Sequence, residues 1–288
     1  MKKAYLFAAI SIFFWSTTAV ATKLLLGTLN SMQIIFASSI VAFLFLLVVN
    51  IFNGKLPEVR KFSLSDHFMM VLIGSLGIFF YRLFLYLGID RMDSSKAFII
   101  NYLWPITSVV FSCILLKEKM TPKKIIALLL SFAGVIIVAS GGSSSGENSL
   151  LGAIFCALGA VSYGVFAALN KKKNYDQFLS MMLYYLHSSL LSLIYLLIVG
   201  DSLALTFAEG LGMLWMGIFS SALPLLLWAL ALNSGDTAKI SNLAYITPFL
   251  GLVWSYVILK EQIGILSFVG LAVIIAGILL QLKDKKSN

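Results

Sequence analysis

Ten apolar segments, each long enough to cross a lipid bilayer, follow one another along this chain of 288 residues. A helix crosses the hydrocarbon core with about 20 residues, and it satisfies its own backbone N–H and C=O groups there. Only 11% of the residues are charged, whereas a soluble domain carries roughly a quarter. We therefore predict an all-α integral membrane protein. The predicted spans are residues 4–26, 31–52, 67–89, 96–116, 123–140, 150–170, 178–199, 209–232, 239–259 and 263–282.

The sequence also repeats itself without gaps: Asp93 recurs as Asp236, 143 residues further along the chain. Each copy holds five of the ten predicted spans, and five is an odd number. The second copy therefore enters the bilayer upside down relative to the first. Six further residues recur at the same spacing: Lys96, Tyr102, Pro105, Lys117, Glu118 and Gly134 reappear as Lys239, Tyr245, Pro248, Lys260, Glu261 and Gly277.

This repeat predicts the domain organisation. We expect a first five-helix repeat at residues 1–140, an external Gly/Ser linker at 141–149 and an inverted second repeat at 150–288. Inverted repeats that share a site near the bilayer midplane are typical of secondary transporters, because each half can close one side.

The positions of the charges predict the orientation in the membrane. The net charge is +9, yet most of the 21 Lys and Arg residues fall in the segments that would be cytoplasmic if the N-terminus is inside. Positive residues concentrate on the cytoplasmic side of membrane proteins. We therefore expect both termini in the cytoplasm, and we assign the basic charge to topology rather than to nucleic-acid binding.

The sequence holds no pattern typical of catalysis or metal binding. Its two histidines, His67 and His187, have no Cys, Asp or Glu at ligand or triad spacing, and no phosphate-binding or dinucleotide motif occurs. We predict no enzyme activity, no cofactor and no metal. All 12 Asp and Glu lie in loops or at the ends of predicted spans, which argues against proton exchange through a buried carboxylate.

Prolines interrupt three predicted spans, at Pro105, Pro224 and Pro248. A proline inside a helix removes one backbone hydrogen bond and frees a carbonyl four residues earlier, here those of Asn101 and Ala244. In a membrane such a group needs protein or a water-filled cavity around it. We expect the breaks at Pro105 and Pro248 to face each other at a binding site; kinks that serve packing alone are the alternative. The polar and aromatic residues beside them are Asn101, Tyr102, Trp104, Asn242 and Tyr245.

Arg82 is the one charge that falls well inside a predicted span, roughly 10 Å from its outer end at 1.5 Å per residue. A charge at that depth faces a partner or a cavity, or its side chain reaches back to the interface. The first interpretation makes Arg82 a ligand for a substrate carboxylate, which a guanidinium group fits well. The second gives it no function in binding.

The motifs resemble those of the EamA family of the drug/metabolite transporter superfamily over essentially the whole chain. Leu-Lys-Glu closes the fourth and ninth spans, and Asn101–Pro105 reads Asn-Tyr-Leu-Trp-Pro. The second motif is similar to the branch that contains bacterial aromatic amino acid exporters. That resemblance implies ten helices and a central cavity lined by Trp15, Tyr81, Tyr102, Trp104, Trp228 and Tyr245.

Two positions depart from this branch. Tyr163 stands where the exporters usually have tryptophan, and Arg82 stands where they can carry an acidic residue. A reversed charge puts the identity of the substrate in doubt more than the fold.

The leading hypothesis is export of amino acids or related small zwitterions by alternating access, as a monomer in the bacterial inner membrane. A carrier of quaternary amines, drug-like cations or phosphorylated metabolites is the second hypothesis. A membrane enzyme or scaffold is the third, and the missing catalytic groups and the paired proline breaks argue against it. We expect the lipid bilayer and a small solute as partners, and no nucleic acid.

Overall fold

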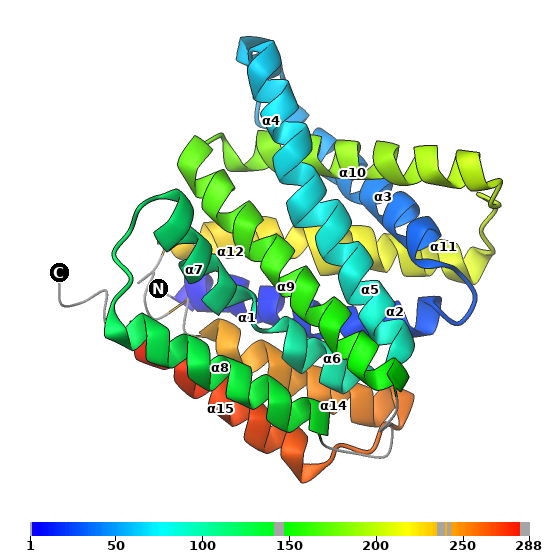
Figure 1. The fold of residues 1–288 in the computed structure, drawn as a ribbon. Helices are drawn as coiled ribbons and strands as arrows, with labels where there is room; N and C mark the ends of the chain where they lie inside the picture. The colour runs from blue at the N-terminus through cyan, green and yellow to red at the C-terminus, as the bar shows by residue number, and fades with distance from the viewer. Residues whose placement is uncertain (1, 141–146, 235–239, 241–242, 283–288) are drawn as a thin grey trace. The chain divides into compact units, whose positions relative to one another are not determined.

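The computed structural model describes residues 2–140, 147–234, 240 and 243–282, and these form helices and no strands (Figure 1). Eight helical stretches of this part are long and apolar enough to cross a membrane. Two further apolar helices, Ala244–Leu259 and Ile265–Leu280, are shorter and fall in the last two predicted spans. An all-helical membrane protein is thus confirmed, whereas ten full spans and their inversion stay a prediction. The eight stretches are Lys2–Leu25, Ser31–Phe52, Leu64–Arg91, Ser94–Leu115, Pro122–Ser140, Ser149–Lys173, Gln177–Val199 and Phe207–Ser234.

The chain forms two compact units, and each takes helices from both halves of the sequence. Unit 1 comprises Met1–Phe79 and Tyr175–Trp254, and unit 2 comprises Phe80–Asn174 and Ser255–Asn288. The chain passes from one unit to the other inside η2, between Asn174 and Tyr175, and inside α14, so η2 and α14 are shared.

Unit 1 holds ten complete elements in its described residues, besides the shared ones; nine are given first. They are α1 (Lys2–Ser16), α2 (Thr18–Leu25), α3 (Ser31–Phe52), η1 (Leu56–Lys61), α4 (Leu64–Gly74), α10 (Gln177–Val199), α11 (Phe207–Leu214), α12 (Leu223–Ser234) and η4 (Ala244–Ile246). The π-helix η3 (Trp215–Ala222) joins α11 to α12. The shared elements are the π-helix η2 (Ser75–Phe80) and α14 (Thr247–Leu259).

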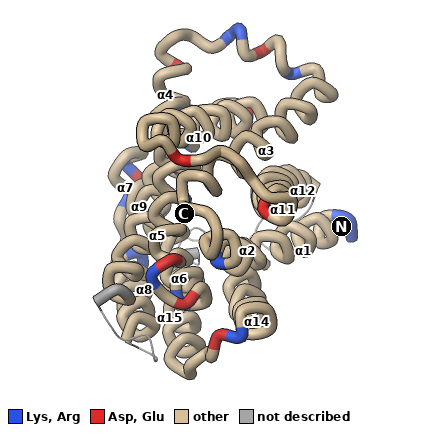
Figure 2. Tube along the Cα trace, turned by 90° about the vertical axis from the view of Figure 1, so that its right-hand side faces the viewer, with Lys and Arg blue, Asp and Glu red and all other residues tan. Residues whose placement is uncertain are grey.

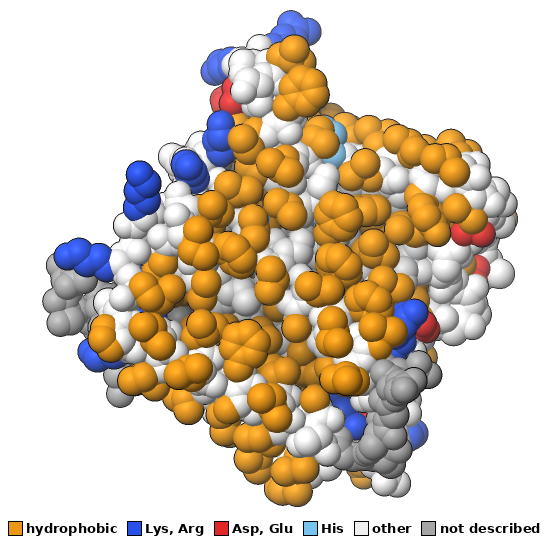
Figure 3. Space-filling model, viewed as in Figure 1, with side chains coloured by type: hydrophobic (Ala, Val, Ile, Leu, Met, Phe, Trp, Pro, Cys, Tyr) orange, Lys and Arg blue, Asp and Glu red, His pale blue; other side chains and the backbone are white. Residues whose placement is uncertain are grey.

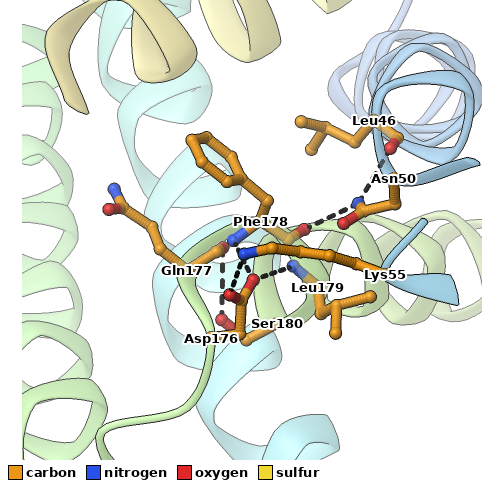
Figure 4. Close-up of polar contacts among 8 residues, drawn as sticks. All are labelled: Leu46, Asn50, Lys55, Asp176, Gln177, Phe178, Leu179 and Ser180. Atoms are coloured by element: carbon orange, nitrogen blue, oxygen red, sulfur yellow. Dashed lines mark hydrogen bonds and ion pairs between the residues drawn. The ribbon is translucent and has the colours of Figure 1, made fainter. Parts of the chain in front are cut away.

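Inside unit 1, α3 and α4 pack on α10, and α1 packs on α12. Gly74 of α4 allows one close approach, because a Cβ atom there would stand 2.9 Å from the Cα of Tyr184 on α10. Near the C-terminal end of α3, the side-chain amide of Asn50 donates a hydrogen bond to the carbonyl of Phe178 on α10 at 3.2 Å (Figure 4).

Unit 2 holds α5 (Tyr81–Arg91), α6 (Ser94–Asn101), α7 (Trp104–Leu115), α8 (Pro122–Ser140), α9 (Glu147–Lys173) and α15 (Ile265–Leu282). Here α9 packs on α5 and α7, and α8 packs on α15. The contact between α8 and α15 depends on glycine: a Cβ at Gly134 would stand 2.7 Å from the carbonyl oxygen of Gly270. Small residues allow such backbone approach where lipid supplies little hydrophobic driving force.

Local structure repeats at the same spacing as the sequence. Ser63 and Asp66 form a capping box at the start of α4, and Thr206 and Glu209 form the equivalent box at the start of α11. Each box satisfies backbone N–H groups that a helix start leaves without partners. The same short-range chemistry thus begins the third and eighth predicted spans.

Two further equivalences follow. Lys117 and Lys260 both adopt a left-handed backbone, each with φ 57°, directly before Glu118 and Glu261. The π-helices η2 and η3 also fall at corresponding positions, each after the capped helix and before the next α-helix. π-Helices are rare and occur often at functional sites.

The two equivalent glutamates differ in their partners, although both belong to unit 2. The carboxylate of Glu261 accepts hydrogen bonds from the backbone N–H groups of Ser94 at 2.8 Å and Ser95 at 3.0 Å, which start α6. Glu118 instead pairs with the ammonium of Lys171 at 2.8 Å. Glu261 therefore caps a helix, whereas Glu118 takes part in an exposed ion pair.

The surface fits a lipid environment. Charged residues of the described part gather mostly in loops and at helix ends (Figure 2). Hydrophobic side chains cover most of the face drawn in Figure 3, and large ones stand exposed, such as Ile198 at 79% and Phe52 at 86%. Such exposure would be unfavourable in water and is expected against acyl chains.

Candidate functional site

Four predicted site residues come together inside unit 2, and we call them the Asn101 cluster: Tyr81, Asn101, Trp104 and Tyr163. The ring centroids of Tyr81 and Tyr163 lie 5.1 Å apart, and those of Trp104 and Tyr163 lie 5.2 Å apart. Asn101 donates from Nδ2 to the hydroxyl oxygen of Tyr81 at 3.1 Å. Residues far apart in the sequence thus form one aromatic group with an amide at its edge.

The sequence places each member of the cluster at or near a helix terminus or break, except Tyr163. Tyr81 is the first residue of α5 after the π-helix η2, Asn101 ends α6, and Trp104 begins α7. Pro105 follows as the second residue of α7, where its missing N–H costs nothing. Two residues thus separate the end of α6 from the start of α7, just before Pro105.

The side chain of Asn101 is only 2% exposed, and its Oδ1 atom is one of several buried polar atoms that have no hydrogen-bond partner among the described residues. An acceptor left unsatisfied when buried costs about 1–3 kcal/mol. Native proteins rarely leave one without a reason such as a functional role. The Oδ1 atom is therefore a candidate acceptor for a donor on a bound molecule.

Arg82 and Tyr102 are both buried in unit 2, at 8% and 5% exposure. The Arg82 side chain lies inside the protein, which disfavours the interpretation that it reaches out to the membrane interface. Tyr102 occupies the turn between α6 and α7, with its ring centroid 6.1 Å from that of Trp104.

Two other predicted site residues meet inside unit 1. Trp15, near the end of α1, and Trp228 of α12 have ring centroids 5.3 Å apart. Trp228 also packs on a small buried cluster that includes Ala4 and Ala8 of α1. This pair and the Asn101 cluster belong to different units, so the single cavity expected from the sequence stays a prediction.

The prolines of unit 1 behave differently from the expectation. Pro224 is buried in the first turn of α12, and the π-helix η3 precedes it where a break was expected. The carbonyl of Ala244, expected to be free, accepts a hydrogen bond from the N–H of Thr247 in the 3₁₀ turn before Pro248. A three-residue turn thus supplies one partner for this carbonyl, and its availability to a solute stays a prediction.

Tyr245 lies in the 3₁₀ helix η4 and is half-buried. Asn242 and part of the predicted linker lie outside the described residues.

Two tryptophans that the sequence did not single out, Trp215 and Trp254, lie beside the break in the first span. Each indole N–H donates to a side-chain hydroxyl of unit 1, Trp215 to Thr17 at 3.0 Å and Trp254 to Ser16 at 2.8 Å. Neither tryptophan stands near a motif, so the only signal was the Trp-Ser-Thr sequence of Trp15–Thr17, whose hydroxyls are the acceptors.

The arrangement suits the binding of a small organic molecule. Among the described residues, no group of three or more His, Cys, Asp and Glu could hold a metal ion. The Asn101 cluster and the pair of Trp15 and Trp228 offer aromatic faces and the amide of Asn101, which bind by stacking, cation–π contact and hydrogen bonds.

Comparison with known proteins adds the family. Residues 2–140 and 150–282 match the EamA-like transporter family. A protein of Clostridium kluyveri described as an uncharacterized transporter is 24% identical, covering 100% of this chain and 96% of the relative. The aromatic amino acid exporter YddG of Ancylobacter novellus is 23% identical, covering 60% of this chain and 62% of the relative.

The fold is similar to a solved crystal structure with a TM-score of 0.69 and 20% sequence identity. The alignment covers 98% of this chain and 96% of the matched chain. At that identity the likeness concerns the fold alone.

Proposed function

Because the chain belongs to the EamA-like transporter family, we propose that this membrane transporter exports amino acids or related small zwitterionic metabolites by alternating access. We place it in the bacterial inner membrane as a monomer with both termini in the cytoplasm. The relative named as an aromatic amino acid exporter supports the substrate class.

The observation that carries the substrate class is the Oδ1 atom of Asn101, buried without a partner among the described residues. An amino acid brings an ammonium group with three N–H donors, and a hydrogen bond to a charged donor contributes more than a neutral one. The rings of Tyr81, Trp104 and Tyr163 offer faces for the same cation or for an apolar side chain.

Arg82 supplies the complementary charge in this proposal. A zwitterion also brings a carboxylate, which a guanidinium group can bind through two parallel hydrogen bonds. Arg82 follows Tyr81 directly and is almost fully buried, so a carboxylate bound by it would be shielded from water.

Carriers of other solutes form the second candidate, favoured by the aromatic residues alone. A quaternary amine stacks well on such rings but has no N–H donor for Asn101, and a buried arginine would repel it. A phosphorylated metabolite would call for further basic groups beside Arg82. The amide and the guanidinium together thus favour a zwitterion.

Counterflow in proteoliposomes tests the proposal. Vesicles are loaded with the unlabelled form of the solute under test, and uptake of labelled L-phenylalanine and L-threonine is compared with uptake of labelled choline and glucose 6-phosphate. We expect the amino acids to exchange and the other two solutes to remain outside. Exchange of choline or the sugar phosphate in their place would refute amino acid transport.

A variant pair links the activity to the site. Asn101→Ala should raise the half-saturating concentration by about ten-fold or more, the loss expected for a hydrogen bond to a charged group. Asn53→Ala alters an exposed asparagine after α3 and should leave the half-saturating concentration unchanged. Equal transport by both variants would remove Asn101 from the site.

A further inference from the structure

The first membrane-spanning segment is interrupted between α1 and α2. At the interruption the N–H of Thr17 bonds to the carbonyl of Phe14 at 3.2 Å, a three-residue spacing instead of the four of an α-helix. The hydroxyls of Ser16 and Thr17 donate to the carbonyls of Phe13 at 2.7 Å and Phe14 at 2.8 Å. Side chains thus take over part of the hydrogen bonding that the backbone loses.

Each of these hydroxyls also accepts a hydrogen bond from a tryptophan. The indole of Trp254 on α14 donates to Ser16, and the indole of Trp215 in η3 donates to Thr17. A hydroxyl has one donor and two acceptor sites, so each can take both roles at once. Two chains of the form indole N–H, hydroxyl, carbonyl therefore hold the junction.

Aromatic contacts support the same two connections. The ring of Phe13 meets that of Trp254 edge-on at 5.6 Å, and the ring of Phe14 meets that of Trp215 edge-on at 5.6 Å. Edge-to-face pairs contribute beyond the area they bury. Each tryptophan is thus fixed by its ring and by its N–H.

Trp15 directly precedes the two residues, Ser16 and Thr17, whose hydroxyls accept these bonds. It precedes Ser16, which is fully buried, and its ring lies 5.3 Å from that of Trp228. The direction of the Trp15 side chain depends on how α1 ends, and the hydroxyl bonds determine that ending.

We propose that Trp215 and Trp254 are positioning residues, which hold the α1–α2 junction and thereby orient Trp15 toward Trp228 for solute binding. The role of Trp15 in binding rests on the proposed function. The positioning of Trp15 by the two indole N–H groups is a property of unit 1 itself.

Transport kinetics provide the first test, with labelled L-phenylalanine in counterflow. Thr17→Val removes the hydroxyl at nearly constant shape, and Trp215→Phe removes the N–H. Each should raise the half-saturating concentration by about 3- to 10-fold, the effect of one buried hydrogen bond, and leave the maximal rate nearly unchanged. Trp254→Phe should act in the same way through Ser16.

Conservative and paired variants separate positioning from general damage. Thr17→Ser keeps the hydroxyl and should behave as the unaltered protein. The double variant Thr17→Val with Trp215→Phe should be no worse than Thr17→Val alone, because Thr17→Val has already removed the bond that Trp215→Phe removes. Tyr256→Phe removes a hydroxyl from an exposed residue of α14 and serves as the control. Additive losses in the double variant would overturn the proposal.

A readout that does not depend on any solute comes from ¹⁹F NMR of protein labelled with 5-fluorotryptophan. The five tryptophans give five resonances, assigned by single Trp→Phe changes. Thr17→Val should shift the Trp215 and Trp15 resonances, whereas Thr17→Ser should leave both at their positions in the unaltered protein. A Trp15 resonance that stays in place would refute the proposal even in an active protein. If no amino acid is transported but the resonances shift as expected, the proposed function fails and the positioning stands.

Discussion

At the scale of single residues, the candidate site depends on polar groups buried among aromatic rings. Asn101 keeps one acceptor without a partner in the described part, and Arg82 keeps a full charge at 8% exposure. Burying an acceptor without a partner costs free energy, so its retention at Asn101 indicates a use. The prolines that the sequence emphasised matter less directly, because a short turn supplies a partner for the carbonyl before Pro248.

Replacing Arg82 tests the substrate charge. Arg82→Gln should lower the affinity for a zwitterion by about ten-fold or more, because a charge-assisted bidentate contact is lost. Arg82→Lys keeps the charge but lacks the planar guanidinium group, so its affinity should lie between those of the unaltered protein and Arg82→Gln. Binding is measured by the shift in thermal unfolding with L-phenylalanine concentration. Unchanged affinity in Arg82→Gln would mean that the carrier does not bind a carboxylate there.

At the scale of elements, helix ends and junctions carry most of the specific structure. The carboxylate of Glu261 caps α6, the short helix that ends at Asn101. Its repeat-equivalent Glu118 pairs instead with Lys171, whose side chain is 61% exposed. The same residue at equivalent positions thus contributes differently to stability.

These two glutamates provide a matched pair of variants. Glu261→Ala should destabilise the protein by about 1 kcal/mol, the usual cost of losing a helix cap. Glu118→Ala should cost less, since exposed ion pairs contribute about 0–1 kcal/mol. Thermal unfolding in detergent measures both. An equal or larger loss for Glu118→Ala would contradict the cap assignment.

The start of α10 makes a pH-dependent contribution. Asp176 accepts from the N–H groups of Phe178 and Leu179 and pairs with Lys55 (Figure 4). Partial burial disfavours its charged form, but Lys55 and the two N–H groups outweigh that effect and hold the pKa of Asp176 below its ordinary value. Because the pKa is lower in the folded state, the charged carboxylate stabilises the fold at pH values above the unfolded-state pKa, about 3.9. This contribution is lost as the pH falls through the folded-state pKa.

Asp176→Asn should therefore unfold at a lower temperature than the unaltered protein at pH 7, and the gap should narrow toward pH 3. Melting curves in detergent between these values check the trend. Glu58→Gln, at an exposed position of η1, should show no comparable gap. A constant difference for Asp176→Asn across the range would show that the charge is not the cause.

At the scale of the whole molecule, the compact units and the sequence repeat do not coincide. Each unit combines helices from both halves of the chain, and the chain passes between units inside η2, between Asn174 and Tyr175, and inside α14. The sequence-based domains, residues 1–140 and 150–288, therefore describe the repeat rather than the packing. The inverted orientation of the repeat stays a prediction that needs a topological experiment.

Labelling of tagged termini in intact cells tests that orientation. Both ends should be protected from a reagent that does not cross the membrane, because basic residues concentrate on the predicted cytoplasmic side. A tag inserted in the predicted linker at 141–149 should react. Termini found on opposite sides would exclude two halves with five spans each.

The sequence by itself determined that the chain is all-helical and which segments become apolar helices. This feature depends on the length of the apolar stretches, so neighbouring residues suffice to predict it. Only the tertiary structure decided that the first span breaks after Ser16, that π-helices precede Tyr81 and Leu223, and that Trp215 and Trp254 bond to Thr17 and Ser16. Those features require partners distant in sequence, and the free energy of a buried hydrogen bond depends on whether packing brings donor and acceptor together.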